Sequence, residues 1–229
     1  MDQFADHVAP KTAFQIFGIN VSESVVWGAF TVLLLIIFAA VVRIFVIPKF
    51  KIVPGKFQII VEWLVGCFDS MSTQTGRFSK YIGPYIFGTA AFICVGTLLE
   101  LTGLRPPIAD INTCAALALM SFFLINLFGI RKHGPIGRIK YYFKPSAIVG
   151  PFRIMSDLMV PVSMSFRLFG SILSGMITME IIYAALEELI VVPLVFPAFF
   201  SIIFTLFHAF IQAYIFAVLT TTFVAEATE

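Results

Sequence analysis

The chain has 229 residues, of which 59% are hydrophobic and only 12% are charged. Because so few polar residues could not cover a water-soluble globule, the composition excludes a soluble protein and predicts an integral membrane protein. The formal net charge is only +2, and the basic residues do not cluster with aromatic residues, which excludes a nucleic-acid partner.

The first apolar run covers residues 25–47 and follows an N-terminal segment, residues 1–24, that contains Asp2 and Asp6. This run is too long for the core of a signal peptide, and its length matches the roughly 20–25 residues of one bilayer crossing. We therefore expect it to be retained as the first transmembrane helix.

Residues 55–72 have a different pattern. Phe57, Ile60 and Leu64 recur at helical spacing, whereas Glu62 lies elsewhere on the helical wheel. A helix with one apolar side and one polar side is typical of the membrane interface rather than of a bilayer crossing. The sequence therefore predicts an interfacial helix in this segment.

Two further apolar runs, residues 81–101 and 108–130, predict the second and third transmembrane helices. The segment between them, TGLRPPIAD, contains Pro106 and Pro107. Paired prolines cannot continue a helix. We therefore expect a short turn here, on the side of the membrane where the chain begins.

A basic loop, residues 131–150, precedes two long apolar runs at residues 151–190 and 198–225, which are separated by Pro193 and Pro197. The two runs predict an antiparallel helical hairpin. Its first arm exceeds the roughly 20–25 residues of a perpendicular crossing, so we expect a strong tilt. The predicted fold is an all-α membrane protein, a single domain with about five membrane-embedded helices and one interfacial helix.

The distribution of Lys and Arg predicts the orientation. Only Lys11 and Arg105 fall on the side where the chain begins, and Arg167 lies within the membrane. The other basic residues share the opposite side: Arg43, Lys49, Lys51, Lys56, Arg77, Lys80, Arg131, Lys132, Arg138, Lys140, Lys144 and Arg153. Positive residues favour the cytoplasmic side. We therefore expect a multi-pass protein of a bacterial plasma or inner membrane, with its N-terminus outside and its C-terminus in the cytoplasm.

Arg167 is the residue of most functional interest. It lies roughly 14 residues beyond Arg153, about 20 Å along a helix, and a buried arginine costs about 2.5–3.5 kcal/mol on insertion scales. The structural alternative is that the side chain extends to the membrane interface, which a tilted helix would make easier. Intramembrane charges usually mark ion pathways, so we favour a functional role.

The hairpin predicts neighbours for Arg167. If the turn is centred near residues 189–190, residues whose numbers sum to about 379 face each other. Arg167 then faces Gln212, whose amide carbonyl accepts hydrogen bonds without neutralising the charge. His208 lies near Ser171, either as a satisfied buried histidine or as part of a polar pathway.

Two acidic residues of the same arm, Glu180 and Glu187, share a face about 220° and 200° around the helix from Arg167. For Glu187 the alternatives of headgroup contact and a polar pathway stay open. For Glu180, which is at least one turn deeper, we favour the pathway.

These residues carry a family resemblance. The segment SMSFRLFGSILSG around Arg167 resembles the signature of subunit a of F-type ATP synthases, the stationary membrane subunit beside the rotating c-ring. The segment IQAYIFAVLTTTFVAEA resembles the last helix of that family, and RPPIADINTCAALAL resembles the start of its third span. The resemblance covers most of the chain from about residue 80, where the quoted motifs lie.

The resemblance implies a mechanism. Two offset half-channels reach the c-ring from opposite sides, and ring carboxylates carry H⁺ or Na⁺ between them in neutral form. Arg167 attracts the empty carboxylate and prevents a short circuit between the half-channels. Arginine suits this role because its charge persists when it is desolvated, whereas lysine loses a proton. The resemblance also implies the c-ring, the peripheral-stalk subunit b and the lipid bilayer as partners.

The resemblance also assigns site residues by position. Arg167 and Gln212 match the family's pair, and Ser171 stands where an asparagine is common. Met176 stands where some members have an acid in the outer channel, so Glu180, one turn further, is a candidate replacement.

Three further polar residues lie away from the outer half of the hairpin: Asp110, Asn112 and Asp157. Asn112, with Asp110, fits the third-helix pattern, although an ordinary N-cap explains Asp110 equally well. Asp157 either lines the cytoplasmic exit or is a surface acid.

No nucleophile and base pair, phosphate-binding loop or metal cluster appears in the sequence. We therefore expect a non-catalytic subunit without a cofactor, with the ATP chemistry in other subunits. The alternative is a secondary ion-coupled transporter or permease, but such proteins usually carry inverted repeats with paired broken helices, and none is evident. A purely structural scaffold would need no buried arginine.

Overall fold

The structure is a computed structural model that describes residues 12–16, 19–50, 55–102, 104, 106–142, 149–187 and 195–228. Within these ranges, five helical segments are long and apolar enough to cross a membrane. They are Glu23–Val46, Gln58–Thr102, Ile111–Gly134, Gly150–Ile182 and Phe199–Thr228. The predicted class, an all-α membrane protein, is confirmed.

One element at the N-terminus was not expected. β1 (Thr12–Ile16) pairs antiparallel with β2 (Ile19–Ser22) in a two-stranded ladder, where the sequence analysis placed only an outside segment. α2 follows directly (Glu23–Val41) and ends in a π turn (Val42–Val46) and a short 3-10 turn (Ile47–Lys49). The 3-10 turn contains Pro48, which has no N–H to continue the helical ladder.

The amphipathic segment forms α3 (Lys56–Ser72), which turns through a 3-10 segment (Thr73–Phe78) into α4 (Ser79–Leu98). The reversal is possible because Gly76 adopts φ 59°, a conformation that a residue with a side chain rarely adopts. A 2.7 Å hydrogen bond between the hydroxyls of Ser72 and Ser79 joins the two helices beside the turn. α4 ends in a 3-10 turn (Leu99–Thr102).

α5 (Ile111–Tyr142) follows a 3-10 turn at Pro107–Ala109 and extends beyond the predicted span. The predicted loop at residues 131–150 is therefore corrected in part, since its first portion is helical. The helix breaks at Gly134, which has φ 73°. Pro135 follows at once, and proline is well tolerated in the first turn of a new helical segment.

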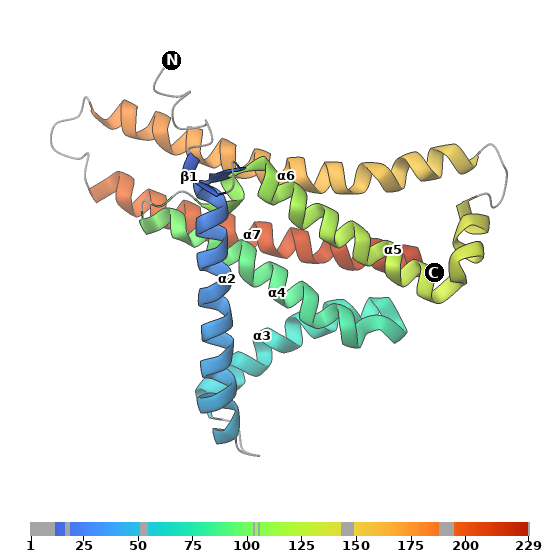
Figure 1. Ribbon diagram of the computed structural model, residues 1–229. Helices are drawn as coiled ribbons and strands as arrows, with labels where there is room; N and C mark the ends of the chain where they lie inside the picture. The colour runs from blue at the N-terminus through green and yellow to red at the C-terminus, as the bar shows by residue number, and fades with distance from the viewer. Residues whose placement is uncertain are drawn as a thin grey trace.

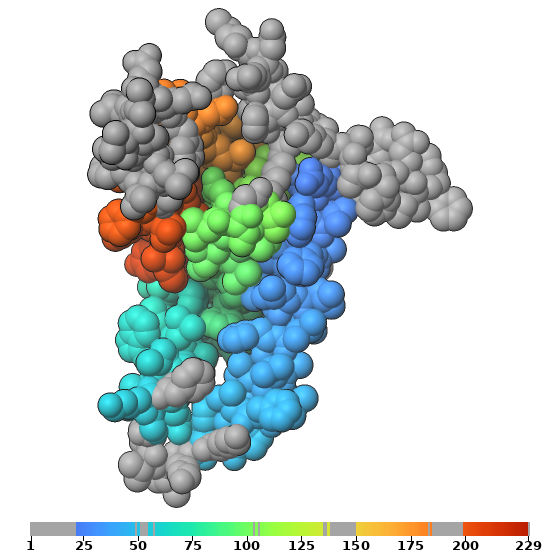
Figure 2. All heavy atoms as spheres, turned by 90° about the vertical axis from the view of Figure 1, so that its left-hand side faces the viewer, coloured from blue at the N-terminus to red at the C-terminus, as the bar shows by residue number. Residues whose placement is uncertain are grey.

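The last two helices are α6 (Val149–Glu187) and α7 (Val195–Thr228). Both run across Figure 1, whereas α2 runs vertically there and also in the view turned by 90° (Figure 2). A membrane that α2 crosses upright is therefore crossed obliquely by the α6–α7 pair. This arrangement agrees with the expected tilted hairpin.

The core lies between α4, α5, α6 and α7 and has two parts. The first cluster includes Ile93, Leu168 and Phe216, and the second includes Ile86 and Val224. α2 stands at one side of the molecule (Figure 2) and contacts the bundle mainly near its beginning, where its neighbours are α4 and the turn before α5. The four-helix core therefore positions the α6–α7 pair, which carries the candidate site.

Candidate functional site

α6 has two faces that differ in side-chain size. The face toward the core carries Met164, Leu168, Ile172 and Met179, all at most 6% exposed. The opposite side carries exposed large residues such as Phe166 and, between them, a row of four small residues and one charge: Ser163, Arg167, Gly170, Ser174 and Thr178. These five residues, spaced by three or four, form one line along the helix. We call this line the α6 stripe.

Arg167 lies near the middle of the α6 stripe and is exposed. Its guanidinium has no hydrogen bond or ion pair with the part of the chain that the structure describes. Large apolar side chains surround it on the same surface, among them Phe166 at 59% and Ile211 at 52% exposure. The described residues thus present a positive charge that none of them compensates to whatever covers this surface.

Gln212 on α7 is 5% exposed and holds the helix pair together at the level of Arg167. Its side-chain amide donates hydrogen bonds to the Ser171 hydroxyl at 2.8 Å and to the main-chain carbonyl of Arg167 at 3.3 Å. The Ser171 hydroxyl donates in turn to the Leu168 carbonyl at 2.9 Å. Gln212 therefore contacts the backbone of Arg167, whereas the expectation was that its carbonyl would receive the guanidinium.

α6 and α7 pack closely at Gly175, on the side of Arg167 toward the C-terminal end of α6. A Cβ added at Gly175 would lie 3.2 Å from a ring carbon of Phe204, so α7 approaches closely here. The Phe204 ring stacks on His208, with ring centroids 6.1 Å apart. The His208 Nε2 atom is buried and has no hydrogen-bond partner among the described residues. His208 thus has an unused polar atom inside the bundle.

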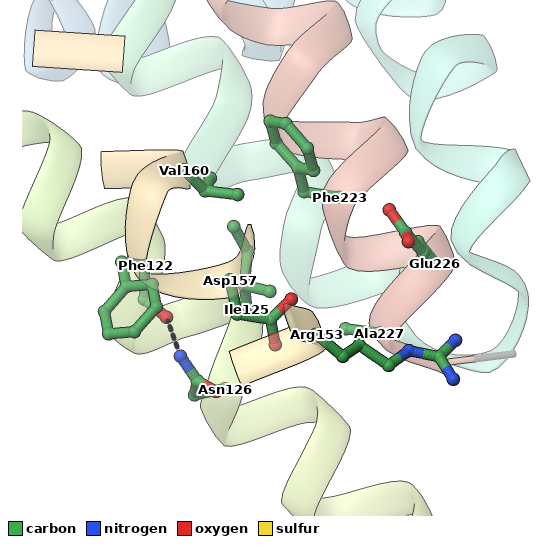
Figure 3. Close-up of a pocket in the computed structure, with 9 residues that line it drawn as sticks. All are labelled: Phe122, Ile125, Asn126, Arg153, Asp157, Val160, Phe223, Glu226 and Ala227. Atoms are coloured by element: carbon green, nitrogen blue, oxygen red, sulfur yellow. Dashed lines mark hydrogen bonds between the residues drawn. The ribbon is translucent and has the colours of Figure 1, made fainter. Parts of the chain in front are cut away.

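The acidic candidates fall in separate places. Glu180 is half-buried, about one and a half turns beyond the close approach at Gly175, and none of its described neighbours forms an ion pair with it. The side chain of Glu187 lies outside the described residues. Asp157 lies on the other side of Arg167, in a pocket with Arg153 (Figure 3). The structure therefore brings Arg167, Ser171 and Gln212 together, but not the acids.

Asn112 belongs to the first turn of α5, and its main-chain N–H donates to the Asp110 carboxylate at 3.0 Å. This bond makes Asp110 the N-cap of α5. Asp110 also accepts a hydrogen bond from the Ser22 hydroxyl at 3.1 Å. Asp110 therefore joins the end of β2 to the start of α5, which supports the N-cap alternative of the sequence analysis.

Sequence reasoning missed one group of polar residues. Asn126 on α5, Arg153 on α6 and Glu226 on α7 line the pocket that contains Asp157 (Figure 3). These residues are far apart along the chain, and Glu226 appeared only within the segment that resembles the family's last helix. The one available signal was that its spacing from Gln212, fourteen residues, places both near the same side of a helix.

A small void also lies beside Arg167 itself. It measures about 10 Å³ and is lined by Arg167 and Gln212 with apolar residues of both helices, namely Met164, Leu168, Ile215, Phe216 and Leu219. This volume is close to the lower limit for a single water molecule. Among the described residues, no group of three His, Cys, Asp or Glu side chains is placed to hold a metal ion.

Comparison with known proteins gives one consistent family. A family model described as ATP synthase A chain matches residues 25–225. ATP synthase subunit a 1 of Chlorobium luteolum is 35% identical over 176 residues, which cover 76% of this chain and 75% of that protein. ATP synthase subunit a of Moorella thermoacetica is 29% identical over 96% of this chain and 97% of its own length. ATP synthase subunit a 1 of Hahella chejuensis is 30% identical over 97% and 91%.

Proposed function

This chain belongs to the ATP synthase A chain family, and from that membership we propose that Arg167 meets the ion-carrying carboxylates of a c-ring along the α6 stripe. The chain is the stationary ion-translocating subunit of a rotary ATP synthase, and the ATP chemistry lies in other subunits. The alternative of a secondary transporter is not favoured. The proposal concerns which residues conduct the ion and which surface meets the ring.

The observation that carries the proposal is the exposed charge of Arg167, which has no partner among the described residues and lies in a line of small side chains. Inside a bilayer, small residues let another helix approach closely, which a line of leucines would prevent. An arginine that faces lipid alone is costly at bilayer depth. A partner helix with a carboxylate satisfies both conditions, because it fits against the small residues and offsets the charge.

The ion then follows two separate paths. One half-channel delivers it from outside to a ring carboxylate, which crosses the lipid in neutral form and releases it into the other half-channel. Arg167 attracts the emptied carboxylate and keeps the ion from passing directly between the half-channels. Its charge persists under desolvation, because the guanidinium spreads the positive charge over three nitrogens and holds its proton firmly.

Gln212 and Ser171 have a supporting role in this scheme. Their hydrogen bonds end on the main chain of α6 at Arg167 and Leu168. A buried amide that donates both of its N–H groups in this way fixes the position of the arginine backbone against α7. We therefore assign Gln212 and Ser171 to positioning Arg167.

Glu180 and His208 belong to the outer half-channel. Both lie on the side of Arg167 that faces the turn between α6 and α7, and both side chains exchange protons. Glu180 replaces the acid that is missing at Met176. Asn112 and Glu187 are assigned to the same outer side, and Asp157 to the cytoplasmic side.

The remaining partners are the lipid bilayer and subunit b of the peripheral stalk. α2 offers them an apolar surface, because most of its side chains are exposed and large. The twelve basic residues on one side support a cytoplasmic C-terminus and an N-terminus outside, in a bacterial plasma or inner membrane.

The test is a pair of Arg167 variants in the whole synthase, reconstituted in liposomes. Arg167→Lys should abolish ATP synthesis although its charge is nominally kept, because burial favours the neutral amine. Arg167→Ala should in addition raise passive ion flux. Each proton that leaks across 100 mV wastes about 2.3 kcal/mol. Near-normal synthesis by Arg167→Lys would contradict the proposal.

A further inference from the structure

A charged pocket lies at the cytoplasmic end of α6 and α7, against α5. It measures about 30 Å³, which is room for one or two water molecules. Its polar residues are Asn126, Arg153, Asp157 and Glu226, and Glu226 is exposed. In Figure 3, the carboxylates of Asp157 and Glu226 approach the pocket from α6 and α7. The pocket thus has one polar end, and its residue Glu226 reaches the surface.

The upper end of this pocket is apolar. Figure 3 shows Val160 and Phe223 together above Asp157, at the end opposite Asn126 and Arg153. Both residues are partly buried, and both pack against the first core cluster as well as the second. Val160 and Phe223 therefore stand at the junction of the two halves of the core.

Beyond them, along the same seam between α6 and α7, lies the smaller void beside Arg167 and Gln212. The two cavities share no lining residue. On α6 they are separated by the step from Val160 to Met164, and on α7 by the step from Phe223 to Leu219. Each step is four residues, about 6 Å along a helix. One turn of apolar side chains thus separates the charged pocket from the arginine.

We infer that Val160 and Phe223, backed by Met164 and Leu219, form a hydrophobic seal that keeps the charged pocket from connecting to Arg167 through the inside of this subunit. The inference rests on the proposed function, in which ions must reach the ring. An aqueous path along the seam would let ions pass behind the Arg167 guanidinium, at Gln212, without turning the ring. The seal leaves the outer surface of the helix pair as the route from the pocket to a ring carboxylate.

The physical basis is the contrast between the two cavity walls. Water enters a small cavity when polar groups offer two to four hydrogen bonds, whereas an apolar cavity of similar size stays dry. Protons cross a membrane protein along hydrogen-bonded water, so a dry layer one turn thick interrupts the path. Met164 is 3% exposed and packs in the first core cluster, and this packing fills the layer.

The experiment measures passive H⁺ influx into liposomes that contain the complete synthase, at an imposed membrane potential and without nucleotide, so that synthesis-coupled flux is absent. Phe223→Ala should raise the influx about tenfold or more, because the lost ring joins the two cavities and extends water along the seam to Gln212, behind the guanidinium that separates the half-channels; tenfold corresponds to a barrier lower by about 1.4 kcal/mol. Phe223→Leu keeps an apolar layer and should stay near the wild-type influx. Phe123→Ala is the matched control, since Phe123 is 69% exposed on α5.

Val160→Ala removes a smaller side chain from the α6 side of the same apolar layer and should raise the influx less than Phe223→Ala does. It keeps the test decisive if Phe223→Ala fails to assemble. Co-purification of the ring with each variant checks assembly. Wild-type influx in assembled Phe223→Ala or Val160→Ala would overturn the seal, and so would equal leaks in Phe223→Ala and Phe123→Ala. Arg167→Ala in the same assay keeps the two proposals apart, because a leak there with none in Phe223→Ala would sink the seal alone.

Discussion

α2 and α6 are both long, apolar helices with an exposed side, but their exposed sides differ in kind. On α2 the exposed residues are large, for example Leu33 at 55%, Ile36 at 60% and Phe38 at 63%. The only buried residues of α2 are Ser24 and Thr31, both small and polar. On α6 large residues such as Phe166 are exposed as well, but the α6 stripe, a line of small residues with one charge, runs between them.

The difference separates two kinds of membrane surface. Lipid chains solvate leucine and phenylalanine as well as a protein core does, so nothing drives small or charged residues toward lipid. Small residues are useful where another helix comes close. We therefore interpret the exposed side of α2 as a surface for lipid or a loosely packed helix, and the α6 stripe as a surface for a closely packed partner.

The largest expected effect comes from adding bulk to the α6 stripe. A side chain at Gly170 would meet nothing within 4 Å in this chain. Gly170→Leu should therefore leave the subunit folded but clash with a ring helix, at a cost of about 1–3 kcal/mol, so that ring recovery and ATP synthesis fall about tenfold or more. The measurement is the yield of ring in the purified complex together with the synthesis rate.

Ala39→Leu on α2 is the matched control, because Ala39 is also small and exposed. It should change neither quantity. An equal loss from Ala39→Leu, or none from Gly170→Leu, would remove the distinction between the two surfaces.

A smaller effect is expected at the outer half-channel. Glu180→Leu and His208→Leu should each slow ion-driven synthesis about tenfold and leave assembly intact, because a positioned proton carrier contributes at least that factor. Glu62→Leu on α3 is the control, since Glu62 is exposed and accepts only a local hydrogen bond from Gln58 at 2.7 Å. Unchanged synthesis in both test variants would show that Glu180 and His208 are packing residues.

The smallest effect is expected from the buried polar groups of the two helices. Gln212→Leu removes the hydrogen bonds that join α7 to α6 and should lower the free energy of unfolding by about 1 kcal/mol. Thr31→Val on α2 removes only a bond to the carbonyl of Trp27 in the same helix and should change it by less than about 0.5 kcal/mol. Thermal unfolding in detergent compares the two, and a larger loss in Thr31→Val would reverse the assignment.

Much of the fold could be predicted from the sequence, because the thickness of the bilayer and the period of the helix restrict where transmembrane helices can begin and end. The long apolar runs predicted five membrane-spanning helices, and the prolines between residues 190 and 198 predicted the hairpin. The hairpin register followed from the turn alone, and the structure places Gln212 at the main chain of Arg167 and Phe204 at Gly175, both pairs with the expected sum.

The features that could not be predicted from the sequence depend on tertiary contacts or on a single dihedral angle. The Gln212 amide points to the backbone rather than to the guanidinium, a choice made by side-chain rotamers. The pocket that contains Asp157 and Glu226 forms only where α5, α6 and α7 pack together, and the sequence does not show this packing. The helical stretch after Gly134 rests on one glycine with positive φ, and the β1–β2 ladder is too short for a strong alternating pattern.

The most direct test of the central idea, that the α6 stripe faces the ring at Arg167, is disulfide cross-linking in the assembled synthase. Cys67, Cys94 and Cys114 are first replaced by alanine, and one cysteine is placed beside the ring carboxylate. Ser174→Cys on the stripe should cross-link to it, since a disulfide requires Cα atoms within about 7 Å, whereas Ala39→Cys on α2 should not. Cross-linking from Ala39→Cys with none from Ser174→Cys would contradict the account.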